Sequence, residues 1–266
     1  MTCSESSPGP LCGELILALN GAEDRLQIAI GENQNLVHSQ EWVLPGQVMR
    51  ILAPAVHDAL ARLGKTPEQV RGLAVVRGPG GFTGLRLCLS LALGFSKGSS
   101  ALLAGIDYLP LLAASAPAAD SGSLWVLTHA RRGQVHIQGF DSKTLAPLSP
   151  PVAASLEQAM EAVSQGPLPG RLLGSGLRRN LPFFSDRLKN GSAGQAADFV
   201  FLPRQYDSPR PDKLFSAALE AKYGPGPIEP LYLRSSDAEE NLDSIARKRG
   251  LDPEKARQDL NRLSKS

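Results

Sequence analysis

The stretch from residue 72 to residue 98 constrains the fold of this chain more than any other. It reads GLAVVRGPGGFTGLRLCLSLALGFSKG. It predicts a short apolar strand over Leu73–Val76, a glycine-rich turn over Arg77–Gly84 and a helix over Thr83–Lys97. Thr83 is the expected N-cap, because its hydroxyl can accept a hydrogen bond from a backbone N–H group that is unpaired in the first helical turn. We therefore expect the rest of the chain to be organised around a strand, a turn and a helix.

The predicted helix carries apolar side chains on two of its sides. A narrow polar stripe holds Arg86, Ser90, Gly94 and Lys97, one apolar stripe holds Leu85, Cys88, Leu89 and Ala92, and a second apolar stripe holds Leu87, Leu91 and Phe95. An ordinary surface helix has a single apolar stripe and a wide polar face. One side of this helix can therefore pack on its own sheet, while the other side needs a second cover. That cover is either another part of this chain or another protein.

Alternating leucines offer a second interpretation of the same residues. They stand at positions 85, 87, 89, 91 and 93, which also fits a strand. We favour the helix because the residues between them include Ser90, Ala92 and Gly94, and because no β-branched residue follows Thr83 in this stretch. Leu, Ala and Arg are good helix formers.

Composition excludes several classes of protein. The 266 residues hold 28 Lys and Arg against 26 Asp and Glu, so charge gives no reason to expect direct, sequence-blind binding to nucleic acid or membrane. The three cysteines, Cys3, Cys12 and Cys88, form neither a disulfide framework nor a zinc pattern. The N-terminus lacks the features of a signal peptide, and no stretch approaches the roughly 20 apolar residues of a membrane helix. We expect a soluble, cytoplasmic protein.

The first third of the chain predicts three strands, a helix, a strand and a helix. The strands Leu15–Leu19, Leu26–Ile30 and Leu36–Leu44 are separated by turn residues, which indicates an antiparallel meander. Apolar positions at helical spacing follow over Val48–Leu63. Pro54 lies inside that pattern and should either kink the helix or mark its first turn.

The remaining elements are shorter. Strands are predicted at Ala101–Ile106, Leu124–His129, Gln134–Asp141, Arg171–Gly174 and Phe199–Leu202, and helices at Tyr108–Ala116, Ser155–Ser164 and Pro211–Lys222. Ser155 is the expected cap of its helix. Residues 1–13 are rich in Ser, Pro and Gly and are expected to be a disordered leader. Residues 236–266 are expected to form a charged helical tail.

No arrangement of catalytic side chains can be read from the residues. The four histidines form no helical i, i+4 pair and have no cysteine beside them, so we expect no metal site and assign no catalytic residue. The glycine-rich turn could offer backbone N–H groups to a phosphate, although it matches neither the P-loop nor the dinucleotide fingerprint. Such a turn is more commonly structural, with glycines that allow close packing.

Three segments carry a resemblance to a known family. RGPGGFTGLRLCLSLALGFSKG closely resembles the signature R-G-P-G-S-F-T-G-[VL]-R of the TsaB family, also called YeaZ. ARRGQVH (residues 130–136) is similar to that family's A-R-R-G-E-V-Y hairpin, and PLYLR with the following SDAEENL (residues 230–242) is similar to its closing segment. The first string is specific, whereas the other two would be weak alone. The similarity covers residues 15–242.

This resemblance implies an α/β fold of the actin-like ATPase type. Two related lobes, each a ribonuclease-H-like unit of mixed sheet and helices, are expected at residues 14–107 and 108–235. The helix at 211–222 is expected to return to the first lobe. The strand and helix order of residues 15–98 agrees with this expectation.

The resemblance also implies a role and partners. Members of the family are non-catalytic dimerization subunits of the machinery that makes threonylcarbamoyladenosine at position 37 of tRNA. They pair with the catalytic subunit TsaD, and the ATPase TsaE joins the assembly. We therefore expect no intrinsic cofactor, ATP and metal held by the partners, tRNA contacted indirectly, and homodimerisation as a possible use of the same helices.

Carried over to this sequence, the resemblance assigns three groups of residues. The partner interface comprises Val48, Ile51, Leu52, Ala55, Leu87, Ser90, Leu91, Gly94 and Phe95. The glycine-rich motif comprises Arg77, Gly78, Pro79, Gly80, Gly81, Phe82, Thr83, Gly84 and Arg86. Arg131 and Arg132 are candidates for a contact with an anion or RNA.

Three positions depart from the family pattern. Asn20 stands where an acid is usual, Val48 where a histidine is often found, and His129 where an aspartate is usual. Catalytic relatives of the fold use carboxylates to position a metal-bound nucleotide. A small-molecule kinase or ATPase would need an acid near Asn20 and another at the lobe junction, where Asp107 is the nearby candidate. A glycoprotease-like metallopeptidase would need paired metal-ligand histidines.

Overall fold

The computed structural model describes residues 14–43, 46–190 and 198–233, together with the single residues 247, 252 and 254. The chain divides into two compact units, residues 1–231 and 232–266, and the strands and helices given below all belong to the first. The predicted leader at 1–13 lies outside the described residues, as does the predicted tail at 236–266 apart from those three single residues.

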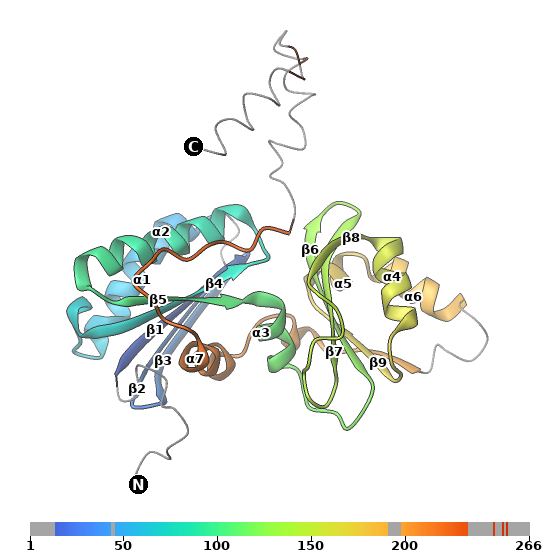
Figure 1. Ribbon diagram of the computed structural model, residues 1–266, viewed down its shortest axis with the longest axis horizontal. Coiled ribbons are helices and arrows are strands. Elements are labelled where there is room, and N and C mark those ends of the chain that lie inside the picture. Colours follow the sequence, from blue (N-terminus) through green and yellow to red (C-terminus); the bar gives the residue numbers. More distant parts are fainter. Residues whose placement is uncertain are drawn as a thin grey trace. The chain divides into compact units, whose positions relative to one another are not determined.

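Two five-stranded sheets form the framework (Figure 1). The first sheet contains β1 (Leu15–Glu23), β2 (Arg25–Glu32), β3 (Asn35–Val43), β4 (Val70–Gly78) and β5 (Leu102–Asp107), in the order β3-β2-β1-β4-β5. The second sheet contains β6 (Ser123–Arg131), β7 (Gln134–Asp141), β8 (Val152–Ser155), β9 (Gly170–Leu173) and β10 (Phe199–Phe201), in the order β10-β9-β6-β7-β8.

The two sheets share one topology. In each, the first three strands form an antiparallel meander, and the fourth strand pairs parallel to the first and to the fifth. The architecture is therefore the two-lobed α/β fold that the sequence predicts. Its internal repetition is not visible in the sequence, where no repeat is apparent.

Helices cover the faces of both sheets. They are α1 (Val48–Arg62), η1 (Pro67–Gln69), α2 (Phe82–Ser99), α3 (Tyr108–Ser115), α4 (Leu156–Gln165), α5 (Ser175–Arg179), α6 (Leu181–Asn190), η3 (Arg204–Tyr206) and α7 (Pro211–Glu220). α1 and α2 lie side by side on one face of the first sheet, and α7 packs against β1 and β2 on the opposite face (Figure 1). No described helix is long and apolar enough to cross a membrane.

The central strand of the first sheet is buried on both faces. Leu15, Leu17 and Leu19 of β1 belong to the apolar cluster formed with α1 and α2. Ile16 and Ala18 belong to a second cluster, formed with α3 and α7. Successive side chains of a strand point to opposite faces, so a strand covered by helices on both sides reads as a continuous apolar run.

Helix termini confirm one predicted cap and correct another. Ser155 caps α4, because its Oγ accepts a hydrogen bond from the Gln158 N–H at 3.2 Å. Thr83 is not a cap. α2 begins at Phe82 with Gly81 as its N-cap, and the Gly81 carbonyl already accepts from the Leu85 N–H at 3.1 Å. The helix therefore starts earlier than predicted, which leaves Thr83 inside its first turn.

Three further observations concern helices. Pro54 lies in the interior of α1 rather than in its first turn. The sequence prediction missed α5 and α6. α5 has only five residues, too few for a periodic pattern. α6 carries a proline at its second position. Proline is accepted there because the first N–H groups of a helix have no intrahelical acceptor.

Candidate functional site

The glycine-rich turn between β4 and α2 lies against the backbone at the end of β1. A Cβ atom on Gly80 would lie 2.2 Å from the Ala22 carbonyl oxygen, and one on Gly84 would lie 2.1 Å from the Gly21 carbonyl oxygen. The Gly81 N–H donates to the Ala22 carbonyl at 2.6 Å. Atoms cannot approach so closely once a side chain is added, so glycine is required for packing here. The turn has the geometry of a tight structural connection.

The second lobe repeats this arrangement at the turn between β9 and α5. A Cβ atom on Gly174 would lie 2.3 Å from the Leu127 carbonyl oxygen, and one on Gly176 would lie 2.7 Å from the Thr128 carbonyl oxygen. Both carbonyls belong to β6, which is the counterpart of β1 in the second sheet. In each lobe, then, glycines that follow the fourth strand pack on the backbone of the first strand.

Two arginines of the glycine-rich motif have defined surroundings. Arg77 Nε lies 2.6 Å from Asp107 Oδ1, and the Arg77 carbonyl accepts from the Leu231 N–H at 2.8 Å. The ion pair with Arg77 therefore occupies Asp107, the acid that a kinase-type site would need at the lobe junction. Arg86 is exposed, and its guanidinium lies over the Phe82 ring, 5.4 Å from the ring centroid.

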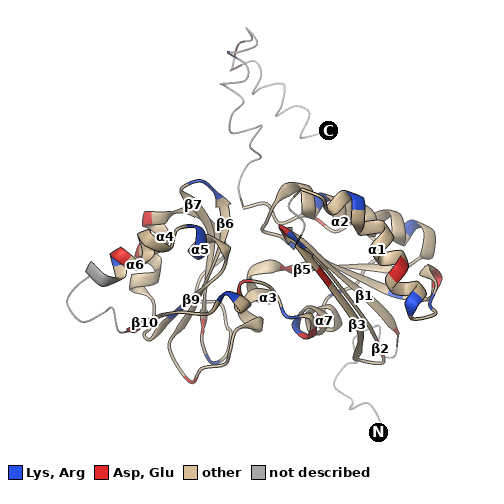
Figure 2. Cartoon of the chain, turned by 180° about the vertical axis from the view of Figure 1, so that it is seen from behind, with Lys and Arg blue, Asp and Glu red and all other residues tan. Residues whose placement is uncertain are grey.

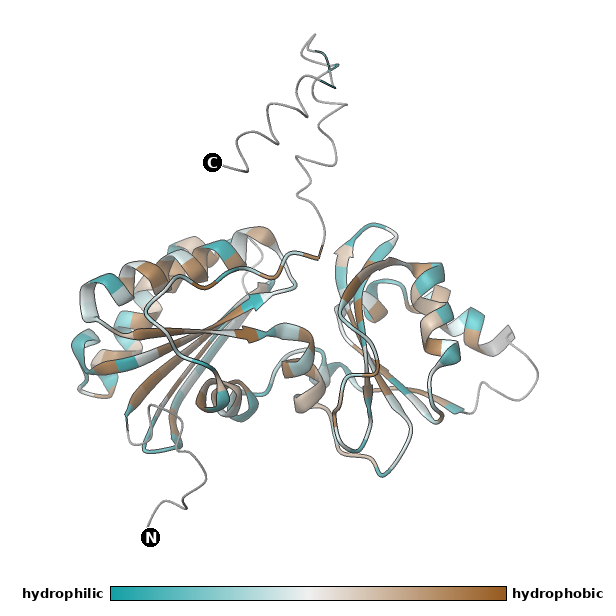
Figure 3. Ribbon diagram, viewed as in Figure 1, coloured by the Kyte–Doolittle hydropathy of each residue, from teal (hydrophilic) through white to brown (hydrophobic). Residues whose placement is uncertain are grey.

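The side of α1 and α2 that faces away from the sheet, here named the outer face, is rich in apolar side chains. Met49 is 72% exposed and Leu93 is 39% exposed. The half-buried apolar residues of α1 and α2 include Ile51, Leu87, Leu89, Leu91 and Phe95, which also pack against the cluster formed with the first sheet. Ser90 and Gly94 are exposed among them. Figure 3 shows apolar residues along α2. The second apolar stripe of α2 is thus only partly covered by the chain itself.

Three residues predicted for the partner interface do not lie on the outer face. Val48, Leu52 and Ala55 are buried in the cluster formed with the first sheet. They share one stripe of α1 with Val56 and Ala59, which are also buried. The periodic apolar stripe of α1 therefore packs on the chain's own sheet. The exposed apolar residues of α1 lie beside this stripe.

Asn20 occupies a buried hydrogen-bond network near the end of β1. Its Nδ2 donates to Gln27 Oε1 at 2.7 Å, and its Oδ1 accepts from the Ala22 N–H at 3.0 Å. Gln27 Nε2 donates in turn to Glu41 Oε2 at 2.9 Å and to the Pro209 carbonyl at 2.7 Å. Both the nitrogen and the oxygen of the Asn20 amide group are engaged by the protein. This position therefore presents no charged oxygen to a metal-bound nucleotide.

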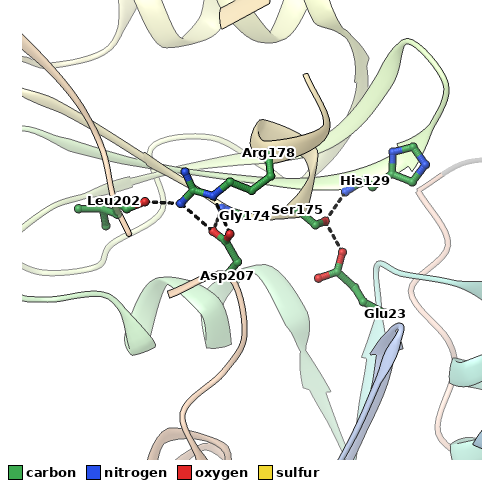
Figure 4. Close-up of polar contacts among 7 residues, drawn as sticks. All are labelled: Glu23, His129, Gly174, Ser175, Arg178, Leu202 and Asp207. Carbon is green, nitrogen blue, oxygen red and sulfur yellow. Dashed lines mark hydrogen bonds and ion pairs between the residues drawn. The ribbon is translucent and has the colours of Figure 1, made fainter. Parts of the chain in front are cut away.

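Glu23 is an acid that the sequence patterns do not single out (Figure 4). It is the last residue of β1, and it accepts hydrogen bonds from the Tyr108 O–H at 2.8 Å and from Ser175 Oγ. Burial raises the pKa of the Glu23 carboxyl, against the lowering effect of these two hydrogen bonds. Because Ser175 follows 152 residues later in the chain, nothing local in the sequence marks the contact.

A partly buried ion pair holds α5 in place beside Glu23. Arg178 Nε lies 2.7 Å from Asp207 Oδ2, and both side chains are 16% exposed. Asp207 Oδ1 also accepts from the Gly174 N–H at 2.8 Å, and Arg178 donates to the Leu202 carbonyl (Figure 4). The pair fixes the start of α5 to the segment that leads from β10 to α7.

The hairpin between β6 and β7 carries the remaining predicted residues. Arg131 and Arg132 are exposed at its tip (Figure 2), and Arg131 Nε donates to Gln134 Oε1 at 2.9 Å. The His129 N–H donates to Ser175 Oγ at 2.9 Å. Within the described part of the chain, no three His, Cys, Asp or Glu side chains are grouped so that they could hold a metal ion.

Comparison with solved structures identifies the fold. The chain is similar to YeaZ from Pseudomonas aeruginosa, with a TM-score of 0.61 and 19% identity over 83% of this chain and all of that one. A second structure, described as an uncharacterized protein with similarity to peptidase YEAZ from the same organism, gives a TM-score of 0.65 with the same identity and coverage. The fold is thus that of YeaZ, in agreement with the prediction.

Sequence comparison identifies the family. The chain is 30% identical over 123 residues to the tRNA threonylcarbamoyladenosine biosynthesis protein TsaB of Escherichia coli K12, a match that spans 46% of this chain and about half (52%) of that relative. It is 26% identical over 230 residues to TsaB of Bacillus subtilis 168, covering 84% of this chain and 96% of that one. The family model described as TsaD, tRNA N6-adenosine threonylcarbamoyltransferase, matches residues 35–201. The chain therefore belongs to the TsaD family, and its curated relatives are the TsaB proteins.

Proposed function

We propose that this chain is a non-catalytic subunit of the machinery that makes threonylcarbamoyladenosine on tRNA, and that it docks on a TsaD-like catalytic subunit through the outer face of α1 and α2. The role rests on the similarity to the TsaB proteins. The docking site rests on one observation, which is that the adjacent helices α1 and α2 leave apolar side chains exposed or only half-buried.

The outer face has the make-up of a protein interface. Leu87, Leu91 and Phe95 are half-buried on α2, and Met49 of α1 is largely exposed. Apolar side chains gathered on two neighbouring helices gain free energy when a partner removes them from water. The small residues between the leucines of α2 let a partner helix approach closely. We infer that the partner buries this face.

The proposed absence of catalysis is supported by the side chains at the positions where a catalytic relative would need free carboxylates. Asn20 is a neutral amide, Asp107 is paired with Arg77, and Glu23 is occupied by Ser175 and Tyr108. ATP and its metal would then be bound by the TsaD-like subunit and by a TsaE-like ATPase. Contact with tRNA would be made through the complex, with Arg131 and Arg132 as the candidate contacts of this chain.

Co-elution tests the docking proposal. The chain and the TsaD-like subunit of its own organism should elute together in size-exclusion chromatography at micromolar concentration. Leu91→Glu should abolish the complex, because it places a charge in a face that becomes dry on binding. Val200→Glu is the matched control, since Val200 is 50% exposed on the second lobe and should leave the complex intact. Circular dichroism establishes that both variants are folded.

Two results would overturn the proposal. Separate elution of the wild-type chain and its partner would overturn the docking role. A complex that survives Leu91→Glu would overturn the outer face as the docking site. Nucleotide hydrolysis by the purified chain alone would instead support a kinase or ATPase of the actin-like fold. Elution of the isolated chain as a dimer that Leu91→Glu dissociates would show that a second copy uses the same face.

A further inference from the structure

Glu23 connects the two lobes. It ends β1 in the first sheet, and Ser175 begins α5, which packs on β6 of the second lobe. The Ser175 hydroxyl donates to the Glu23 carboxyl and accepts from the His129 N–H, so it is oriented by its own lobe (Figure 4). The other Glu23 oxygen accepts from Tyr108, the first residue of α3. One carboxyl group therefore joins β1 to two helices that follow it in the chain.

The lobes are also joined through α3, by apolar contacts. Side chains of α3, including Leu109 and Leu112, belong to the same buried cluster as Ile16 of the first sheet and Leu124 and Val126 of the second. Apolar packing of this kind is non-directional and tolerates small rotations better than a hydrogen bond does. We take α3 as the place about which one lobe would turn relative to the other.

Among the described residues, the other polar contacts between the end of β1 and the second lobe are weaker or lie elsewhere. Arg179 of α5 lies 3.7 Å from Asp24, but both side chains are more than half exposed, so this ion pair contributes little. Gln27 bonds the Pro209 carbonyl, which belongs to the connection between the lobes rather than to the second sheet. Glu23 and Ser175 thus supply the partly buried contact at this junction.

We propose that Glu23 acts as a latch that holds the two lobes in a single arrangement, with α3 as the hinge. In this arrangement the chain keeps its lobes together through its own side chains and needs no bound ligand between them. The charged groups around the latch are Asp207, Arg179, Asp24 and Arg25, and Tyr108 is the neutral titratable group that bonds it. Loss of the Glu23 carboxyl leaves the hinge intact and frees the lobes to move about it.

Spin-label distances between the lobes test the latch. The full-length chain carries Cys3→Ser and Cys12→Ser, and labels are attached to cysteines introduced at Arg62 of α1 and Glu161 of α4, both exposed. Cys88 stays in place because it is buried. The parent protein should give a narrow distance distribution. Glu23→Ala should give a broader distribution with a longer mean distance.

Three further variants make the test specific. Glu32→Ala is the matched control, because Glu32 pairs with Lys65 at 2.7 Å within the first lobe, and it should leave the distribution unchanged. Ser175→Ala should broaden the distribution as Glu23→Ala does. Glu23→Gln should keep it narrow, because an amide of the same shape can donate to Ser175 Oγ and accept from Tyr108.

The outcomes separate the latch from a general loss of stability. A folded Glu23→Ala variant with the parent distribution would overturn the proposal, and so would equal broadening in Glu32→Ala. Should Glu23→Ala fail to fold, Ser175→Ala decides in the same way. The measurement uses the isolated chain, so its result does not depend on whether a TsaD-like subunit binds the outer face.

Discussion

Gly84 of α2 faces the carbonyl oxygen of Gly21 so closely that a Cβ atom would lie 2.1 Å from that oxygen. The contact joins the first turn of a long helix to the end of the central strand of the same sheet. Neither the backbone of Gly84 nor the Gly21 carbonyl can move aside without shifting α2 or β1, which would cost packing free energy. The position of α2, and with it the outer face, depends on this approach.

Gly84→Ala should therefore destabilise the chain. We expect a loss of about 1–3 kcal/mol in the free energy of unfolding, the usual cost of forcing extra atoms into a packed core. Gly94→Ala is the matched control in the same helix, since a Cβ atom there meets no atom within 4 Å. It should stabilise the chain by roughly 0.5–1 kcal/mol through helix propensity. Urea denaturation measures both, and equal effects would contradict the packing argument.

Asp207→Ala should cost about 1–3 kcal/mol, because it leaves the largely buried Arg178 guanidinium without its counter-charge. It also removes the acceptor of the Gly174 N–H. Asp212→Ala is the control. Asp212 accepts two hydrogen bonds from Arg210 at 3.0 Å, but this pair is exposed and its loss should cost at most about 1 kcal/mol. Thermal and urea unfolding compare the two variants, and a small effect of Asp207→Ala would show that Arg178 finds other partners.

Glu23→Gln should change how stability depends on pH. Burial raises the pKa of Glu23 above its ordinary value of 4.5, so the folded chain holds this proton more tightly than the unfolded chain does. The stabilisation that comes from the protonated carboxyl is present below pH 4.5 and is lost as the pH rises through the raised pKa. The Gln variant cannot lose that proton.

The measurement is the free energy of unfolding of the wild type and of Glu23→Gln across this pH range. Relative to the wild type, the variant should gain stability as the pH increases from 4.5 toward neutrality. The groups that share the junction, Asp207, Arg179 and Tyr108, are the same in both proteins. Parallel curves would mean that the carboxyl has equal proton affinity in the folded and unfolded chains.

Asn20→Asp would restore an acid where the family usually has one, yet we expect it to destabilise the chain. A carboxylate has no N–H group to donate, so one of its oxygens would face the Gln27 Oε1 acceptor in a buried site. A loss of about 1–3 kcal/mol is expected at neutral pH, with recovery in acid as the carboxyl takes up a proton. Chemical unfolding at neutral and acidic pH checks this. Unchanged stability at neutral pH would show that the Asn20 network can adapt to a charge.

The sequence predicted most of the first lobe because its elements are long and regular. β1, β2 and β3 are separated by clear turn residues, and α1 and α2 carry periodic apolar positions. In the second lobe, the strands β6 and β7 were recognised, whereas α5 is too short to have a period. Local pattern thus supplied most of the order of the elements and missed α5 and α6.

The candidate site was predicted less completely, for two physical reasons. The resemblance assigned Val48, Leu52 and Ala55 to an interface, whereas they belong to the buried stripe of α1 that packs in the core. The exposed side of α1 has no periodic signal of its own. The junction of Glu23 and Ser175 exists only after folding, because its members come from different lobes.

The repeated sheet topology ends with unequal helices in the two halves. After the glycine turn the first half continues into the 18-residue α2, whereas the second half continues into the five-residue α5. A duplicated architecture would ordinarily present two equivalent sides to its surroundings. Among the described residues, the short helix breaks the pseudo-symmetry, so the first half carries the longer pair of adjacent helices, α1 and α2. A protein that binds the surface of α1 and α2 can therefore bind in one orientation, because the second half does not present an equivalent surface.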